Sequence, residues 1–202
     1  MANRIVGLRN IHIAKLKANG EYEAPIKLVG AKSVKTTNES NEIAFYSDDV
    51  MDYYGNALSA MSIEVEMAYL TPEIEALLCG KEITSNGAMV TGADDTQATV
   101  AFMYEMSTIA GKPIRRCLYE VILTKSESEA TTKADSVEEK TIKLTGKAKP
   151  RSVDGKFDIV MDANHIPDGT DEQFNQAFDK FFTGVLLPDG TFSPAPMVLK
   201  NK

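Results

Sequence analysis

Cysteine and histidine are scarce in this chain of 202 residues, which has two of each. Cys79 and Cys117 match no zinc or redox spacing, and both stand among apolar residues. They indicate small core side chains in a reducing compartment, with a disulfide or a catalytic thiol as the lesser alternative. His12 and His165 have no cysteine or carboxylate arrangement nearby at ligand spacing. We therefore expect no metal site, no cofactor and no catalytic histidine.

Motifs of catalysis are also missing. The chain has no phosphate-binding glycine pattern, no nucleophile elbow and no zinc-protease helix. The doublets Asp48-Asp49 and Asp94-Asp95 carry oxygens of the kind that Ca²⁺ prefers, but neither is followed by the spaced ligands and the glutamate of a calcium loop. Loop capping and solvation explain them better. An enzyme is therefore the disfavoured interpretation.

Long apolar runs and basic runs are absent as well. The start, MANRIVGLRNIHIAKLK, interleaves Arg and Lys with apolar residues, so it has neither the core of a signal peptide nor the length of a membrane span. The formal net charge of -7 argues against nucleic-acid binding, because that affinity comes mainly from Lys and Arg at phosphates. We expect a soluble protein, made in the cytoplasm, without membrane association.

The patterns that are present begin with the stretch from Ser59 to Ile83. Alternating apolar residues from Ile63 to Tyr69 predict a strand with one dry face. Directly after it, Thr71 suits the helix N-cap, Pro72 suits the first helical position, and Gly80 supplies the left-handed residue that ends the helix. A strand therefore leads into one short capped helix.

Strand patterns recur along the chain, with turn signals between them. They cover residues 6–16, with a bend or bulge at Arg9 and Asn10, residues 25–37, with Gly30 inside, and residues 98–106, 113–124, 137–149 and 157–161. Asn86-Gly87 and Pro188-Asp189-Gly190 predict hairpin turns. Ser126 to Glu139 has almost no large apolar residue and predicts a solvated loop.

A second helix is predicted from residue 170 to residue 182. Thr170 and Gln173 form a capping box at its start, and Gly184 follows its end. Its apolar face consists of Phe174, Ala177, Phe178 and Phe181. We expect this face to pack over a sheet, with a plug between subunits as the alternative.

Together these patterns predict a mainly β fold, an antiparallel β-sandwich or partial barrel with one or two short flanking helices. No internal repeat and no linker forces a domain boundary. We expect one domain over residues 1–202, with the helix 170–182 and the C-terminal tail 184–202 as peripheral additions.

The segment from Asn38 to Leu58 follows neither the helix period nor the strand period. Its aromatic residues are mixed with aspartates, and we interpret it as a long irregular loop, which in a compact domain is usually functional. If the aromatic side chains are exposed, they are good anchors for another protein surface. The alternative is that they fold back onto the core of their own domain.

Several blocks of the sequence, in their order, resemble one known family. RIVGLRNIHIAKL, PIKLVGAKSVKT, AFYSDDV and IEVEMAYLTPEIEALLCG are similar to the major tail proteins (tail tube proteins) of long-tailed bacteriophages and prophages, in particular the phi13-type family. GADDTQATVAFMYEM and RRCLYEVIL are similar too, so the likeness extends to about Met161. The pair FYSDD and YLTPEIEALLCG is its most specific part.

The resemblance implies a structural virion protein that forms rings of six subunits, stacked into a non-contractile tube through which genomic DNA passes without specific binding. Its partners would be further copies of itself and the tape-measure, distal tail and tail terminator proteins, in the virion tail after assembly in the host cytoplasm. The loop from Ser40 to Asn56 would then reach a neighbouring subunit or ring. Its contact residues would be Phe45, Tyr46, Asp48, Asp49, Tyr53 and Tyr54.

Glu64 and Glu66 are the candidates for the channel side of such a tube. Carboxylates that line a channel repel phosphate and keep DNA from binding as it moves. An ordinary solvated outer face is the alternative for both. Other functions that fit a β protein without a catalytic site are a tube protein of a contractile tail or secretion device, and a carbohydrate-binding decoration module on a virion or cell surface.

Overall fold

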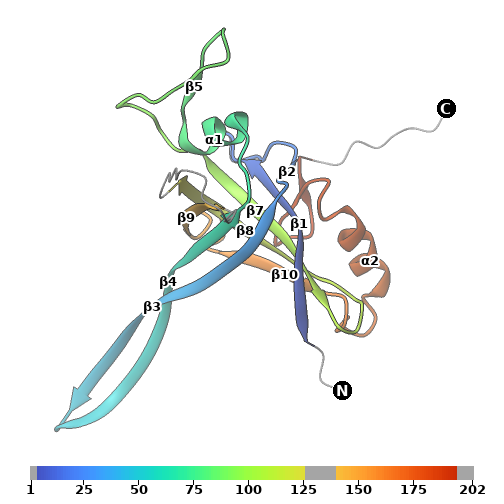
Figure 1. Ribbon diagram of the computed structural model, residues 1–202. Coiled ribbons are helices and arrows are strands. Elements are labelled where there is room, and N and C mark those ends of the chain that lie inside the picture. Colours follow the sequence, from blue (N-terminus) through green and yellow to red (C-terminus); the bar gives the residue numbers. More distant parts are fainter. Residues whose placement is uncertain (1–3, 126–139, 195–202) are drawn as a thin grey trace, which may run out of the picture.

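The computed structural model describes residues 4–125 and 140–194 (Figure 1). The loop predicted from Ser126 to Glu139 and the end of the tail, residues 195–202, lie outside the described residues. Most of the described chain is β-strand, with two short helices, α1 (Pro72–Cys79) and α2 (Asp171–Lys180). The predicted mainly β fold with two flanking helices is confirmed.

One antiparallel sheet of eight strands organises the molecule. The path along it is β2-β1-β7-β8-β9-β4-β3. Strand β10 lies off this path and pairs with residues 114–118 of β8, whereas β9 pairs with residues 121–125 of β8. The strands are β1 (Ile5–Lys15), β2 (Ile26–Lys27), β3 (Ala31–Ser47), β4 (Val50–Met67), β7 (Thr99–Thr108), β8 (Ile114–Lys125), β9 (Ile142–Ala148) and β10 (Asp158–Asp162). Two small hairpins complete the fold, β5 (Glu82–Ile83) with β6 (Met89–Val90) and β11 (Val185–Leu186) with β12 (Phe192–Ser193).

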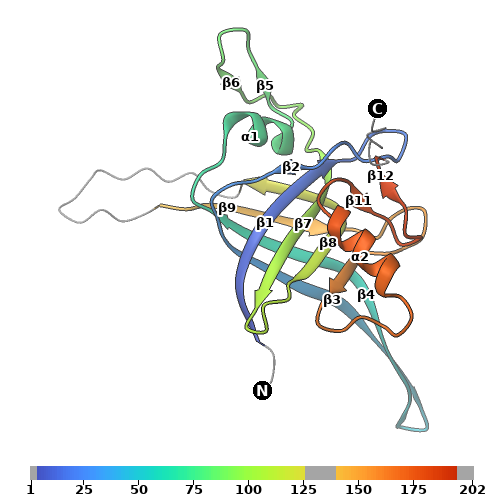
Figure 2. The same ribbon diagram turned by 90° about the vertical axis from the view of Figure 1, so that its right-hand side faces the viewer.

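The centre of the sheet is buried on both faces. Phe102 and Met103 are neighbours on β7, and because successive side chains of a strand point to opposite faces, they enter two different clusters. One cluster lies between the curved sheet and α1, and the other lies under α2. Figure 2 shows α2 across the face formed by β1, β7 and β8.

The first strand and the first helix follow the sequence closely. Asn10 has a φ of 53° at a register shift between β1 and β7, so the predicted bulge is confirmed. At α1, the backbone N–H of Ile74 donates to the Thr71 hydroxyl at 3.4 Å, and Gly80 ends the helix with a φ of 72°. A Cβ on Gly80 would stand 2.1 Å from the carbonyl oxygen of Thr96, so the close approach of the chain also requires glycine there.

The single strand expected over residues 25–37 is two strands with different partners. β2 pairs with β1, whereas β3 pairs with β4. Gly30, with a φ of 87°, stands between them where the chain leaves one edge of the sheet and enters the other.

Helix α2 packs over the sheet, as expected from its apolar face, but its predicted N-terminal cap is wrong. The hydroxyl of Thr170 donates to the carbonyl of Pro167 at 2.7 Å and makes no capping bond to the helix. Competition from the preceding turn explains this, since threonine bonds equally well to local turn carbonyls. Phe178 and Phe181 are buried in the cluster under the helix, which therefore serves the core of its own chain.

The prediction of an irregular loop from Asn38 to Leu58 is wrong. This segment is the outer half of a long β3–β4 hairpin, whose cross-strand pairs continue without a loop to Ser47 and Val50 (Figure 1). Asp48 and Asp49 form the two-residue turn with φ values of 50° and 63°, as the commonest tight hairpin turn requires. No alternation marks these strands because neither of their faces is buried.

Candidate functional site: the β3–β4 arm

The outer half of the β3–β4 hairpin projects away from the body of the protein in both views (Figures 1 and 2). We call residues 40–58 the arm. Every residue of the arm is exposed except Gly55, which is half-buried. Counting from the tip, the first buried residue of β4 is Met61. The arm therefore has no part in the core.

Aromatic side chains predicted to be contact residues lie together on this arm. Phe45 and Tyr53 are a cross-strand pair whose ring centroids are 5.7 Å apart. Tyr46 and Tyr54 lie on the opposite face of the hairpin, as the register requires. All four rings are exposed by 54% to 65%. The alternative that they fold back onto the core is therefore wrong.

Both faces of the arm are apolar. Eight large apolar side chains are exposed on it, so this single hairpin has apolar surface on both of its faces. One face carries Ile43, Phe45, Val50 and Tyr53, and the other carries Tyr46, Met51, Tyr54 and Leu58. Exposed apolar patches of this kind mark surfaces that meet another protein, and a lone two-stranded hairpin is only marginally stable in water.

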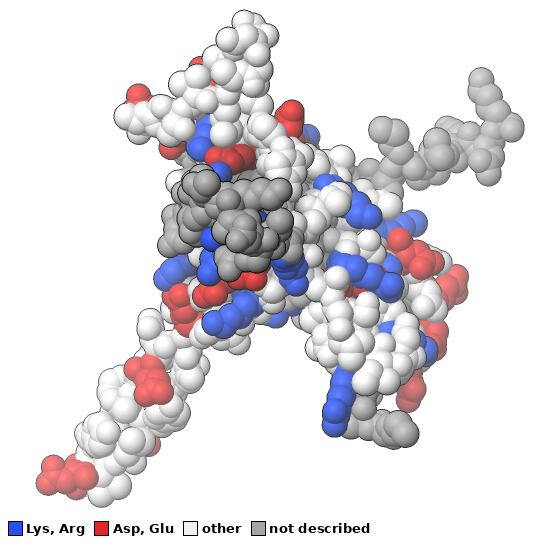
Figure 3. All heavy atoms as spheres, in the orientation of Figure 1, with Lys and Arg blue, Asp and Glu red and all other residues white. Residues whose placement is uncertain are grey.

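All the charge on the arm has one sign. The arm carries four carboxylates, and the chain has no Lys or Arg between Lys35 and Lys81. Figure 3 shows acidic atoms along the arm and no basic ones. The arm carboxylates are Glu42, Asp48, Asp49 and Asp52. A surface that covers the arm is therefore expected to be apolar and basic.

Glu64 and Glu66, the channel candidates, lie on the inner half of β4, on the face turned away from the core. The Oε1 atom of Glu64 is 3.9 Å from the Nζ atom of Lys35, and the Ser33 hydroxyl donates to Glu66 at 3.2 Å. Lys143 on β9 is the cross-strand neighbour of Glu66. This face is thus mixed in charge rather than acidic, and its place on a channel stays a prediction.

The residues considered for metal binding or catalysis lie apart. Within residues 4–125 and 140–194, no group of three or more His, Cys, Asp or Glu could hold a metal ion. His12 stacks on Phe182 at 4.7 Å, and burial lowers the pKa of its imidazole. Cys117 is fully buried, which raises the pKa of its thiol and disfavours the reactive thiolate. Cys79 and Cys117 are both free thiols.

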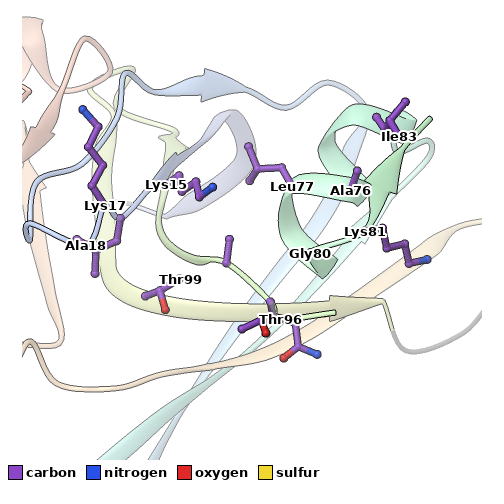
Figure 4. Close-up of a pocket in the computed structure, with 13 residues that line it drawn as sticks. Lys15, Lys17, Ala18, Ala76, Leu77, Gly80, Lys81, Ile83, Thr96 and Thr99 are labelled. Atoms are coloured by element: carbon purple, nitrogen blue, oxygen red, sulfur yellow. The ribbon is translucent and has the colours of Figure 1, made fainter. Parts of the chain in front are cut away.

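An open groove beside α1 was not foreseen. It has a volume of about 740 Å³ and runs between the end of α1 and the turn after β1 (Figure 4). One side carries Lys15, Lys17 and Ala18, and the other carries Ala76, Leu77, Gly80 and Lys81. No short motif could reveal this groove, because its two sides are more than fifty residues apart in the sequence.

The geometry of the arm and the β body does not by itself name a function, and the family comparison supplies one. A family model described as phage tail tube protein matches residues 10–189. The chain belongs to this family. It is therefore a structural protein of a phage tail, and its place is in the virion tail. No described helix of this tail tube protein is long and apolar enough to cross a membrane.

The remaining comparisons add little to this assignment. A chain of the solved structure titled "Cryo-EM structure of the anti-feeding prophage (AFP) baseplate, 6-fold symmetrised" is 9% identical to the tail tube protein, with a TM-score of 0.34. The match covers 73% of this chain and 91% of that chain. No curated protein matches the sequence.

Proposed function

We propose that this tail tube protein assembles with itself into hexameric rings, which stack into the non-contractile tail tube through which DNA passes. The observation that supports this most is the arm, which exposes eight apolar side chains on two faces that its own chain leaves uncovered. Burial of apolar surface is the main driving force of association. Covering the arm with other copies of the chain would therefore contribute favourable free energy to assembly.

The edges of the arm support the same proposal. β3 is the last strand in the path along the sheet, and β4 pairs with β9 only from Met61 to Met67. The backbone groups on both outer edges of the arm are therefore open to strands of another chain within the described part of the protein. Open edges pair with other strands unless something blocks them, and an assembling protein uses this property.

The passage of DNA rests on the charge of the protein. A formal net charge of -7 disfavours retention of phosphate by the protein as a whole, and Glu64 and Glu66, on a face of mixed charge, are the residues proposed to face the channel. In this proposal the tube meets the tape-measure, distal tail and tail terminator proteins, and it forms in the host cytoplasm before it becomes part of the virion.

The test is the mass of the purified protein by light scattering together with negative-stain electron microscopy, fresh and after concentration. We expect rings or hollow tubes. A matched control replaces residues 40–59 with Asn-Gly, which joins the paired residues Glu39 and Ala60 by a two-residue turn and removes no buried side chain. This variant should fold and stay monomeric. A wild-type protein that is monomeric under all conditions would contradict the proposal and favour a decoration module.

A further inference from the structure

The tip of the arm and the groove beside α1 complement each other chemically. At the tip, Asp48 and Asp49 form an acidic turn between exposed aromatic and aliphatic side chains. In the groove, none of the 13 lining residues is acidic, and apolar Leu16 and Leu77 stand beside lysines. The tip thus combines acid with apolar surface, and the groove combines base with apolar surface.

The lysines of the groove differ in whether they form an ion pair within their own chain. Lys81 donates to Glu75 at 2.8 Å, so its charge is neutralised within the chain. Lys15 and Lys17 are exposed and form no ion pair within residues 4–125 and 140–194, although backbone hydrogen bonds place Glu23 opposite Lys15 and Glu21 opposite Lys17. These two ammonium groups are available to carboxylates of another molecule, and charge complementarity of this kind sets the partner and the register of an interface.

The groove is large enough for a hairpin turn. Its volume of about 740 Å³ falls in the range of pockets that enclose a compact ligand, roughly 300–1,000 Å³. The tip is compact, because Ser47 and Val50 are paired directly across the two turn residues. By volume, the groove therefore has room for a compact turn.

The tip cannot reach the groove of its own chain. β4 runs from the tip toward α1, and its 18 residues span about 60 Å at roughly 3.3 Å per residue. Both views show the arm and α1 at opposite ends of the protein (Figures 1 and 2). A tip-to-groove contact must therefore join two copies. When the contact is made head to tail, it produces closed rings or open stacks, whereas a reciprocal contact would give a two-fold dimer.

We infer that the acidic tip of the arm, residues 47–50, docks into the lysine-lined groove beside α1 of a second copy of the chain. The inference deepens the proposed assembly and rests on it, since it names the two surfaces that meet. Lys15 and Lys17 bind the carboxylates of Asp48 and Asp49, and the apolar groove wall covers the flanking side chains of the tip.

A cross-linking experiment tests this contact directly. One chain carries Ser47→Cys at the tip and the other carries Ala18→Cys in the groove, both in a Cys79→Ala background. Both new cysteines are small changes at exposed positions. The matched control pairs the tip cysteine with Ser152→Cys, which is also exposed but does not line the groove. Equal amounts of the two chains are mixed under a mild oxidant and separated on a non-reducing gel.

We expect about tenfold more heterodimer with Ala18→Cys than with Ser152→Cys, because docking raises the local concentration of the two thiols. Equal yields, or none with Ala18→Cys, would overturn the inference. The result separates the two proposals. If tubes form without a preferred tip-to-groove cross-link, the proposed tube function is supported and the proposed contact is contradicted. If the preferred cross-link forms without tubes or rings, the contact is supported and the tube function is contradicted.

Charge changes provide a second readout. Asp48→Asn with Asp49→Asn removes the charge of the tip but keeps a turn that asparagine favours, and Lys15→Glu with Lys17→Glu reverses the charge of the groove. We expect the groove variant to lower the assembled fraction by about tenfold or more, because like charges then face each other. Restoration of assembly in a chain that combines the neutral tip with the reversed groove would support the pairing. Unchanged assembly of the groove variant would contradict it.

Discussion

Phe45 and Tyr53 lie opposite each other across the β3–β4 hairpin, with ring centroids 5.7 Å apart and an angle of 36° between the rings. Both rings remain more than half exposed. The pair holds the register of the arm, since aromatic cross-strand pairs contribute about 0.2–1 kcal/mol to a sheet, yet it leaves most of its apolar surface in water. The pair therefore favours the register of the arm and leaves apolar surface for a partner to cover.

Replacement of both rings, Phe45→Ala with Tyr53→Ala, should abolish assembly and leave the folded monomer intact. The rings touch no core residue, so we expect the free energy of unfolding to fall by no more than about 1 kcal/mol. Urea unfolding of the monomer measures stability, and light scattering measures assembly. The control is Ile109→Ala, a side chain of similar exposure in the turn after β7, which should assemble as the wild type.

A buried carboxylate ties three elements together, and its loss should destabilise the monomer. Glu105 on β7 is 1% exposed and accepts hydrogen bonds from Arg9 and, at 2.6 Å, from Arg115. Arg115 also stacks over the ring of Phe178 on α2. We expect Glu105→Gln to cost about 3 kcal/mol in urea unfolding, because it leaves a buried guanidinium poorly compensated. A loss below about 1 kcal/mol would show that the network is replaceable.

Helix α2 is predicted to contribute to the core of its own chain. Phe181 is fully buried against the sheet, so Phe181→Ala should lower the free energy of unfolding by about 3–5 kcal/mol. Phe174→Ala, at a half-buried position of the same helix, should cost clearly less. Equal and small losses for both variants would instead place the helix in a contact between subunits.

The attachment of α1 should depend on pH through Glu75. Burial alone would raise the pKa of this carboxyl, but hydrogen bonds from Lys81 and Lys125, at 2.8 and 2.9 Å, hold the pKa below its ordinary value. A carboxyl with a lowered pKa in the folded state stabilises the protein above its unfolded pKa of about 4.3, and this stabilisation is lost as pH falls through the folded value.

Glu75→Gln should therefore be less stable than the wild type at about pH 7, and the difference should shrink as the pH falls below about 4.3. Urea unfolding over a pH series from neutral to acidic measures this. A difference that stays constant over the whole range would mean that the ionised carboxylate of Glu75 has no role.

Neutral variants test the channel face. Glu64→Gln with Glu66→Gln leaves the ammonium groups of Lys35, Lys143 and Lys147 on that face, so assembled tubes should retain more duplex DNA. If the face lines the channel, the retained DNA resists nuclease. Complete digestion of the extra DNA would place this face outside. Glu73→Gln with Glu82→Gln, which has the same change in charge at exposed positions elsewhere, is the control.

Much of the β body could be predicted from the sequence, because burial of one face of a strand produces an alternation of apolar and polar residues. The strand from Ile63 shows alternation since one face packs on the core, and Thr71 and Gly80 mark the ends of α1 by local hydrogen bonding and backbone conformation. The arm has no such period, because Phe45 and Tyr46 point to opposite faces and both are exposed. The sequence therefore marked the segment as unusual, but its description as a loop was wrong.

The groove and the Glu105 network could not be predicted, since both join residues that only the fold brings together. Arg9 and Arg115 are more than a hundred residues apart and meet at one carboxylate through the pairing of β1, β7 and β8. Thr170 shows a different limit, because the sequence carries a capping motif there but the Thr170 hydroxyl donates to the carbonyl of Pro167 and does not cap the helix.

The most direct test of the account is a cryo-electron microscopy map of the assembled protein at a resolution that shows side chains. The account predicts hexameric rings in which each arm is covered by neighbouring copies, with Phe45 and Tyr53 buried and the Asp48-Asp49 turn beside the partner's Lys15 and the partner's Lys17. An assembly in which the arms project into solvent, with both rings still exposed, would contradict it.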